Sequence, residues 1–211
     1  MRHAWILAPI IAALLAGPAA AAGPQVAPLT GEDKAEIAGY YKNGSKLLKA
    51  LKYRDTDGSS RIVAIGANPN GSKFNESDDK SYTSMHAYGF LQDHGGQQIR
   101  WEIKEYHDYL CAVKVLTALV DVIDAGDGQP LTMVPYWIPC DGLDATRVKL
   151  IVIYQDRKYA IRGQIPNQEE DEETRVPGEN FRELPPAVRK TVLAYWTRVM
   201  AATKKDGDWG E

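Results

Sequence analysis

Two short Asp-Gly segments have the spacing that comes nearest to metal chemistry in this chain. Residues 55–58 read Asp-Thr-Asp-Gly, which matches part of the calcium-loop pattern D-x-[DN]-x-[DN]-G. The first and last ligand positions of that pattern hold tyrosine and alanine, so two carboxylates remain, Asp55 and Asp57. They are weak calcium candidates, because β-turns explain the same letters: Asp side chains bond to the backbone of such turns. Residues 124–128 match the pattern less well.

Catalytic combinations are harder to assemble. His86, His94 and His107 have no nucleophile, acid or metal partner that the sequence identifies. The chain has no G-x-S-x-G nucleophile elbow and no glycine-rich phosphate loop. Many Asp and Glu residues could form a carboxylate pair for glycosidic cleavage, so their presence does not identify a catalytic pair. We therefore assign no catalytic residue and favour a protein that is not an enzyme, with a periplasmic hydrolase as the alternative.

Cys111 and Cys140 are the two cysteines of the chain. An even cysteine count in an exported protein predicts a disulfide. The bond would close a loop of about 29 residues and contribute about 3–4 kcal/mol by restricting the unfolded chain. Two free buried thiols are the alternative.

The N-terminus predicts that export. Residues 1–22 contain a short positive start, an apolar run over 4–15 and a small-residue site that fits cleavage after Ala22. The apolar run is shorter than the roughly 20 residues that a membrane helix needs, and no later stretch is apolar enough to span. We expect a periplasmic or secreted protein. The formal net charge of −3 argues against nucleic acid as a partner.

Large aromatic residues cluster in sequence around the two cysteines. Trp101, Tyr136 and Trp137 are the candidates for a binding surface, because exposed Trp and Tyr suit sugar rings and protein hot spots. The alternative, which we favour for most of these side chains, is a place in the core. In a strand, adjacent residues face opposite sides, so one of Tyr136 and Trp137 is expected to point outward.

The N-terminal half predicts a helical start followed by strands. Residues 23–29 are predicted as a flexible leader, Thr30 as a helix cap, and 31–51 as one broken or two short helices. A strand follows over 61–66. Residues 84–92 and 98–106 form a hairpin in which Ile99, Trp101 and Ile103 share the buried face.

The C-terminal half predicts more strands and a closing helix. Residues 112–123 fit either a strand or a helix. Prolines confine 131–140 to an edge or irregular strand, and 148–154 with 158–164 form the clearest hairpin. Residues 168–173 are an acidic loop, 185–204 a helix whose apolar face covers a sheet, and 205–211 a disordered tail.

The stretch from Trp101 to Gly163 resembles an uncharacterised bacterial secreted family, some of whose members are labelled surface polysaccharide biosynthesis proteins. The resemblance rests on a Trp-containing strand that leads to Cys111, an Asp-Gly turn, Cys140, and a closing Tyr-Ala-x-Arg-Gly run over 159–163. Residues 55–65 resemble the Asp-x-Asp-Gly turn and strand of FG-GAP-like repeats. The resemblance implies a mostly antiparallel sheet, a disulfide and a cell-envelope role. Arg162 would bind a carboxylate or carbonyl group, or hold the hairpin to the acidic loop.

Together these features predict one α+β domain over 30–204, a twisted and mainly antiparallel sheet with helices from both ends of the chain packed on it. We expect a non-enzymatic envelope protein that binds a glycan or a protein partner, as an inhibitor or assembly factor. The site candidates are Trp101, Tyr136, Trp137 and Arg162. A hydrolase and a calcium-stabilised structural module are the alternatives; no other cofactor is expected.

Overall fold

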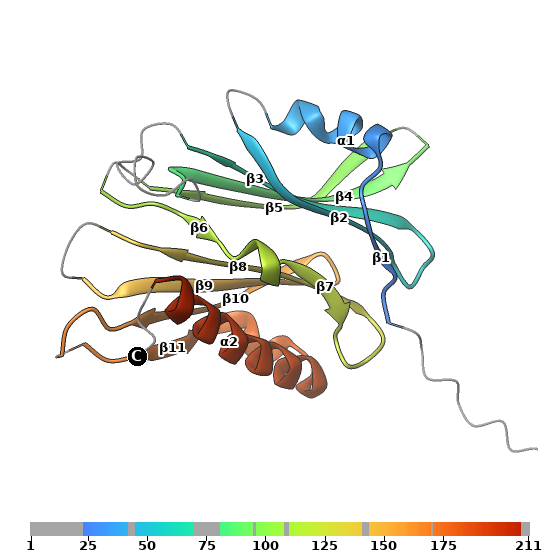
Figure 1. Cartoon of the computed structure of the whole chain (residues 1–211). Helices are drawn as coiled ribbons and strands as arrows, with labels where there is room; N and C mark the ends of the chain where they lie inside the picture. The colour runs from blue at the N-terminus through green and yellow to red at the C-terminus, as the bar shows by residue number, and fades with distance from the viewer. Residues whose placement is uncertain are drawn as a thin grey trace, which may run out of the picture.

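The structure, a computed structural model, describes residues 23–41, 45–69, 81–94, 96–107, 110–140, 144–169 and 171–207. It consists of two antiparallel sheets that lie face to face, with one helix on the outer side of each (Figure 1). This confirms the α+β prediction, with the strands divided between two sheets. The predicted signal peptide, residues 1–22, lies outside the described residues, as do residues 208–211 of the predicted tail.

The first sheet comes from the N-terminal half of the chain and has the order β1-β2-β3-β4-β5. Its strands are β1 (Val26–Pro28), β2 (Lys46–Arg54), β3 (Ser60–Asn68), β4 (Ser84–Asp93) and β5 (Gly96–Tyr106). The prediction of a flexible leader over 23–29 was wrong for its second half. Residues 26–28 form a strand that pairs with Leu51–Tyr53, and the side chain of Leu29 is buried.

The second sheet has the order β11-β10-β9-β8-β6, and β7 also pairs with β8. Its strands are β6 (Lys114–Val115), β7 (Asp121–Asp124), β8 (Pro130–Ile138), β9 (Thr146–Tyr154), β10 (Arg157–Ile165) and β11 (Thr174–Pro177). Residues 112–123, which fitted a strand or a helix, form β6 and β7 with a 3-10 turn, η3 (Thr117–Leu119), between them. The predicted β9–β10 hairpin is confirmed.

Residues 131–140 were predicted as an edge or an irregular strand, and the edge alternative was wrong because β8 lies inside its sheet. Pro135 is tolerated there because β6 and β7 pair with different parts of β8 and leave a break at η3. The carbonyl of Pro135 accepts the N–H of Leu116 at 3.1 Å. In an antiparallel strand the N and C=O of one residue point to the same side. The missing N–H of Pro135 therefore faces the break.

Helix α1 (Gly31–Ile37) continues into η1 (Ala38–Tyr40) and covers the outer face of the first sheet. Thr30 caps it as predicted: its Oγ1 accepts the Asp33 N–H at 3.2 Å, and Asp33 accepts the Thr30 N–H at 3.0 Å. Asp33 also accepts hydrogen bonds from Lys52 at 2.8 Å and Gln92 at 2.9 Å. Burial opposes ionisation of Asp33, but these donors outweigh it and lower its pKa well below the usual range.

The continuation of this helix toward residue 51 was wrong, because Lys46–Arg54 form β2. Leu47, Leu48 and Leu51 fit a helical face, yet the segment pairs with β3 along its whole length. The register shifts between Leu47 and Lys49, so Leu48 is the extra residue of a β-bulge. Pairing with β3, which the local pattern does not contain, decides the conformation.

Helix α2 (Pro186–Asp206) covers the outer face of the second sheet and confirms the predicted C-terminal helix (Figure 1). Its predicted apolar face is buried: Val188, Val192, Tyr195, Trp196 and Val199. A separate apolar layer fills the space between the sheets, with Val63, Ile65, Met85 and Ile103 on one side and Val134, Tyr136, Ile138 and Ile151 on the other. No helix of the described residues is long and apolar enough to cross a membrane.

Candidate functional site

Three hairpin turns meet at one end of the sandwich and surround a cavity of about 250 Å³, here called the end cavity. The β2–β3 turn supplies Asp55 and Asp57, the turn before β8 supplies Gln129, and the β9–β10 turn supplies Asp156. Tyr53 and Arg61 complete its wall. The lining is therefore rich in carboxylate, amide and guanidinium groups, which can hydrogen-bond to a small polar ligand.

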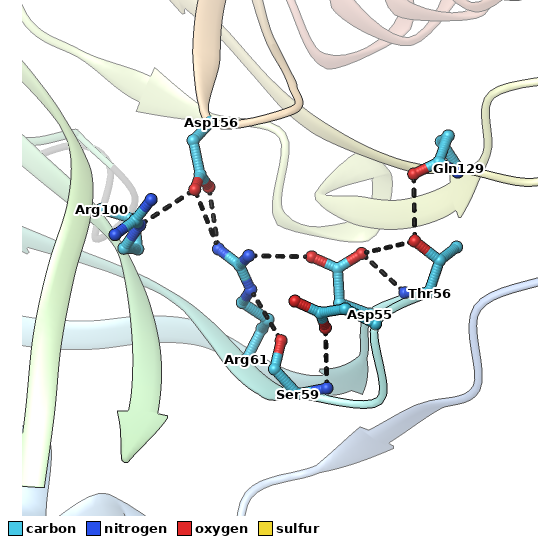
Figure 2. Close-up of polar contacts among 8 residues, drawn as sticks. Asp55, Thr56, Ser59, Arg61, Arg100, Gln129 and Asp156 are labelled. Atoms are coloured by element: carbon cyan, nitrogen blue, oxygen red, sulfur yellow. Dashed lines mark hydrogen bonds and ion pairs between the residues drawn. The ribbon is translucent and has the colours of Figure 1, made fainter.

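Arg61 lies between two carboxylates that belong to different sheets (Figure 2). Its Nη2 is 3.0 Å from Oδ2 of Asp55, and its Nη1 is 2.9 Å from Oδ1 of Asp156. The Arg61 side chain is 12 % exposed, so both ion pairs are shielded from much of the solvent. Burial lowers the pKa of Arg61, but the two carboxylates outweigh it and raise that pKa. The guanidinium thus joins the two sheets at the end cavity.

Arg100 reaches the same carboxylate because of a β-bulge. In the β4–β5 ladder Gly89 pairs with Trp101 and Phe90 with Ile99, which leaves Arg100 as the extra residue. The Nε of Arg100 donates to Oδ2 of Asp156 at 2.9 Å (Figure 2). The bulge also moves Ile99 off the buried face that it was predicted to share with Trp101, and Ile99 is exposed.

The turn that carries Asp156 has an unusual backbone. Gln155 and Asp156 both have positive φ, 50° and 59°. Two-residue hairpin turns of this shape favour Asn, Asp and Gly, because most other side chains, glutamine included, are strained there. Non-glycine residues that keep such a conformation are held by their surroundings. At Asp156 the bonds to Arg61 and Arg100 provide that hold.

The calcium candidates have protein partners in the structure. Asp55 pairs with Arg61, whose positive charge occupies the space beside this carboxylate (Figure 2). Asp57 accepts the Ser59 N–H at 2.8 Å, and the hydrogen bonds from Ser59 lower its pKa. Among the described residues no group of three or more His, Cys, Asp and Glu side chains could hold a metal ion.

The second Asp-Gly segment also forms a self-contained turn. Asp124 accepts the N–H groups of Gly126 at 2.7 Å and Gly128 at 3.0 Å. Asp127 accepts the Gln129 N–H at 3.0 Å and the hydroxyl of Tyr154. Bonds from Asp side chains to the turn backbone are those expected of a β-turn, which was the alternative to a calcium loop.

The three aromatic candidates are core residues, as the favoured alternative predicted, and the expectation that one of Tyr136 and Trp137 points outward was wrong. Trp101 is 8 % exposed, Tyr136 1 % and Trp137 3 %. Tyr136 does face the opposite side of β8 from Trp137, but the second sheet is covered on both faces, so neither reaches the surface. The Trp101 ring lies over Gly89, where a Cβ atom would come within 2.1 Å of it.

Arg162 is the exception among the candidates, because it is exposed on β10. It lines a second, shallower hollow with Lys158 of the same strand and Val176 of β11. Within the described part of the chain Arg162 forms no hydrogen bond or ion pair, so its predicted bond to the acidic loop is not made by any described residue there.

A partly buried polar cluster that sequence reasoning missed lies toward the other end of the strands. Glu105 of β5 accepts hydrogen bonds from the hydroxyl of Tyr136 at 2.6 Å, from Lys149 at 2.7 Å and from His107 at 2.9 Å. Burial raises the pKa of Glu105, but the donors outweigh it and lower that pKa to about 2. We call these four residues the Glu105 cluster. No local motif marks it, because Lys149 lies on the other sheet.

The predicted disulfide is confirmed. Cys111 and Cys140 are bonded, with an S–S distance of 2.07 Å, and form an isolated bridge between their segments. The Nη2 atom of Arg147 lies 3.5 Å from the Cys140 sulfur and 3.8 Å from the Cys111 sulfur. The bond therefore lies beside the cationic end of β9.

Comparisons with known proteins found no match: no family model, no curated protein and no solved structure is similar to this chain at the level required. The function must therefore be argued from the site itself.

Proposed function

We propose that this protein is an exported, non-enzymatic protein of the cell envelope that binds a glycan, with a sugar unit in the end cavity. The observation that carries the proposal is the chemistry of that cavity. Carboxylate, amide and guanidinium side chains converge there, and the ring of Tyr53 forms part of the wall. Sugar hydroxyls both donate and accept, so they match this mixture of groups.

The size of the end cavity suits a small ligand. Its volume of about 250 Å³ is a little below the roughly 300–1,000 Å³ of sites that hold drug-sized molecules. Trp101, Tyr136 and Trp137 are buried, so they contact neither a sugar nor a protein partner. The choice of a glycan therefore rests on the polar lining of the end cavity.

Arg61 is the reason for proposing binding without catalysis. It pairs with Asp55 and Asp156, two of the three carboxylates that line the cavity, and the third, Asp57, accepts the backbone N–H of Ser59 in its own turn. A guanidinium stays protonated in proteins. Glycoside hydrolysis needs one carboxylic acid that gives its proton to the leaving oxygen, and the space between the carboxylates for the substrate. Here that space holds Arg61.

Export is supported by the disulfide, because such bonds persist in oxidising compartments. The resemblance to secreted envelope proteins, which remains a prediction, points the same way. We therefore propose that the protein acts in the periplasm or outside the cell, with the signal peptide removed.

The test is a binding titration of the exported protein with glycan fragments from the envelope. Gln129→Ala removes a cavity amide whose oxygen accepts a hydrogen bond from the Thr56 hydroxyl, and we expect binding to weaken about 5-fold. Gln98→Ala, at an exposed position of β5, is the matched control and should bind as the parent does.

Two results would contradict the proposal. If no envelope fragment binds, the proposal that the ligand is an envelope glycan is wrong. Release of new reducing ends during incubation would replace binding by hydrolysis and restore the hydrolase alternative.

A further inference from the structure

The hollow beside Arg162 has a volume of about 520 Å³ and lies on β10 and β11. Its lining includes Lys158, Ala160 and Arg162 of β10 and Val176 and Pro177 of β11. We call this surface the basic shelf. Val176 is 59 % exposed, which is unusual for a valine in a strand. The shelf therefore combines two cations with exposed apolar atoms.

Strand register places the shelf on the same face as a larger group of cations. Arg162 lies directly opposite Lys149, and Gln164 lies opposite Arg147. Directly paired residues share one face of a sheet. Ile151 and Ile153 belong to the layer between the sheets, so this face is the inward one. Of its eight positions on β9 and β10, four are basic and none is acidic: Arg147, Lys149, Ile151, Ile153, Lys158, Ala160, Arg162 and Gln164.

Like charges placed directly opposite each other in a sheet are destabilising. In the directly opposed pair of Arg162 and Lys149, Glu105 neutralises the charge of Lys149, which it contacts at 2.7 Å. Arg162 and the ammonium group of Lys158 have no hydrogen-bond or ion-pair partner within the described residues. Glu179 is the one acidic residue among those that line the shelf. The shelf thus keeps a net positive charge that folding itself does not use.

We propose that the basic shelf binds the carboxylate or phosphate group of an acidic envelope glycan. A guanidinium presents a planar pair of donors that matches either anion. The exposed side chains of Val176 and Pro177 offer apolar contacts to the carbon face of a sugar ring.

The shelf adjoins the end cavity. Lys158 pairs with Ile153, which lines that cavity, and Asp156 of the cavity wall is two residues away in the chain. A polysaccharide chain can therefore contact both surfaces. The inference rests on the proposed glycan-binding function and specifies an anionic polymer as the ligand.

The test compares a galacturonate oligosaccharide with a neutral glucose oligosaccharide of equal length, each titrated into the full exported protein. Arg162→Gln should weaken binding of the acidic oligosaccharide about 10-fold and leave the neutral one unchanged. Arg175→Gln is the matched control, because Arg175 pairs with Gly163 and so lies on the opposite face of β11. Added salt should weaken acidic binding of the parent more than that of Arg162→Gln.

The outcomes separate the two proposals. Equal effects of Arg162→Gln and Arg175→Gln, or equal affinity for the two oligosaccharides, would overturn the shelf while the end cavity stands. Failure of both oligosaccharides and of envelope fragments to bind would overturn both proposals. Full displacement of the acidic oligosaccharide by a poly-glutamate peptide of the same charge would contradict the glycan and indicate that the shelf binds an acidic protein.

Discussion

At the scale of single residues, partly buried ionic groups join the two sheets at two places. Arg61 connects Asp55 and Asp156 at the end cavity, and Glu105 connects Lys149 and Tyr136 toward the other end. Removing one partner of such a pair leaves an unpaired charge in a poorly solvated place, so the cost is large even where the net stabilisation by the intact pair is small.

Glu105→Gln should lower the free energy of unfolding at pH 7 by about 3 kcal/mol. The pKa of Glu105 is lowered to about 2, so its ionised form stabilises the fold above the pKa of the unfolded chain, near 4.5. The difference between parent and variant should therefore be constant above that pH and should vanish as pH falls to about 2. Denaturant unfolding at a series of pH values measures it.

Glu102→Gln is the control for this series. Glu102 lies on the solvent face of the same strand and pairs with the exposed Lys104, so its loss should change stability by less than about 1 kcal/mol. If Glu105→Gln still lowers the free energy of unfolding at pH 2, the variant loses packing or hydrogen-bond geometry rather than the charge of Glu105.

Calcium should leave the melting temperature unchanged. Arg61 already neutralises Asp55, and Asp57 is engaged by the turn backbone, so a cation would have to displace existing bonds. Thermal unfolding with millimolar calcium and then with a chelator measures this. A rise in melting temperature with calcium that the chelator reverses would support the structural-module alternative.

At the scale of elements, the strained turn between β9 and β10 offers a pair of matched substitutions. Asn and Asp tolerate positive φ, whereas Gln is strained there. Gln155→Asn should raise the free energy of unfolding by about 1 kcal/mol, because it relieves strain and removes no ion pair. Asp156→Asn should lower it by about 2 kcal/mol, because Arg61 and Arg100 lose a charged acceptor.

Opposite signs at these adjacent positions, measured by denaturant unfolding, would show that Asp156 is kept for its carboxylate. If both variants were stabilised, the ion pairs across the sheets would contribute little and the joining role of Asp156 would be lost.

The elements predicted from sequence are those whose signal is local. The hairpins 84–106 and 148–164 carry period-2 alternation with turn residues between, and the Thr30 cap and the apolar face of 185–204 need only neighbours in the chain. β2 was mistaken for a helix because Leu47, Leu48 and Leu51 have helical spacing and the β-bulge at Leu48 hides the alternation of the strand. The alternative of an edge position for β8 was wrong because the break in its partner strands cannot be seen in the local sequence.

The site was less predictable for the same reason. Asp55 was a candidate, but its partner Arg61 was not, and Asp156 lies 95 residues from Arg61 in the chain. Lys149 and Glu105 are 44 residues apart. Arg100 reaches the site through a bulge that alternation alone does not reveal. The aromatic candidates were identified by type, and burial, which type does not determine, removed them from the surface.

At the scale of the whole molecule, the disulfide adds to a fold that already has three apolar layers. Replacing Cys111 and Cys140 by alanine should cost about 3–4 kcal/mol, because the unfolded chain regains the freedom of the closed loop. For a domain of this size the melting temperature should fall by about 10 °C, with a cooperative transition retained.

Calorimetry of the double variant and of the reduced parent protein measures this effect, and the two should agree. Loss of the cooperative transition would show that the domain depends on the bond to fold, and an unchanged melting temperature would show that the loop is restricted in the unfolded chain by other means.

The end cavity and the basic shelf lie on the same side of the β9–β10 hairpin. A bound glycan should therefore contact one continuous set of residues that includes both surfaces. An amide-resolved NMR titration of the exported protein with an acidic envelope oligosaccharide measures that path directly. We predict shifts concentrated in residues 55–59, 129, 155–156 and 158–162, and none along α2. Shifts confined to α2 or spread without pattern, at saturating oligosaccharide, would contradict the account.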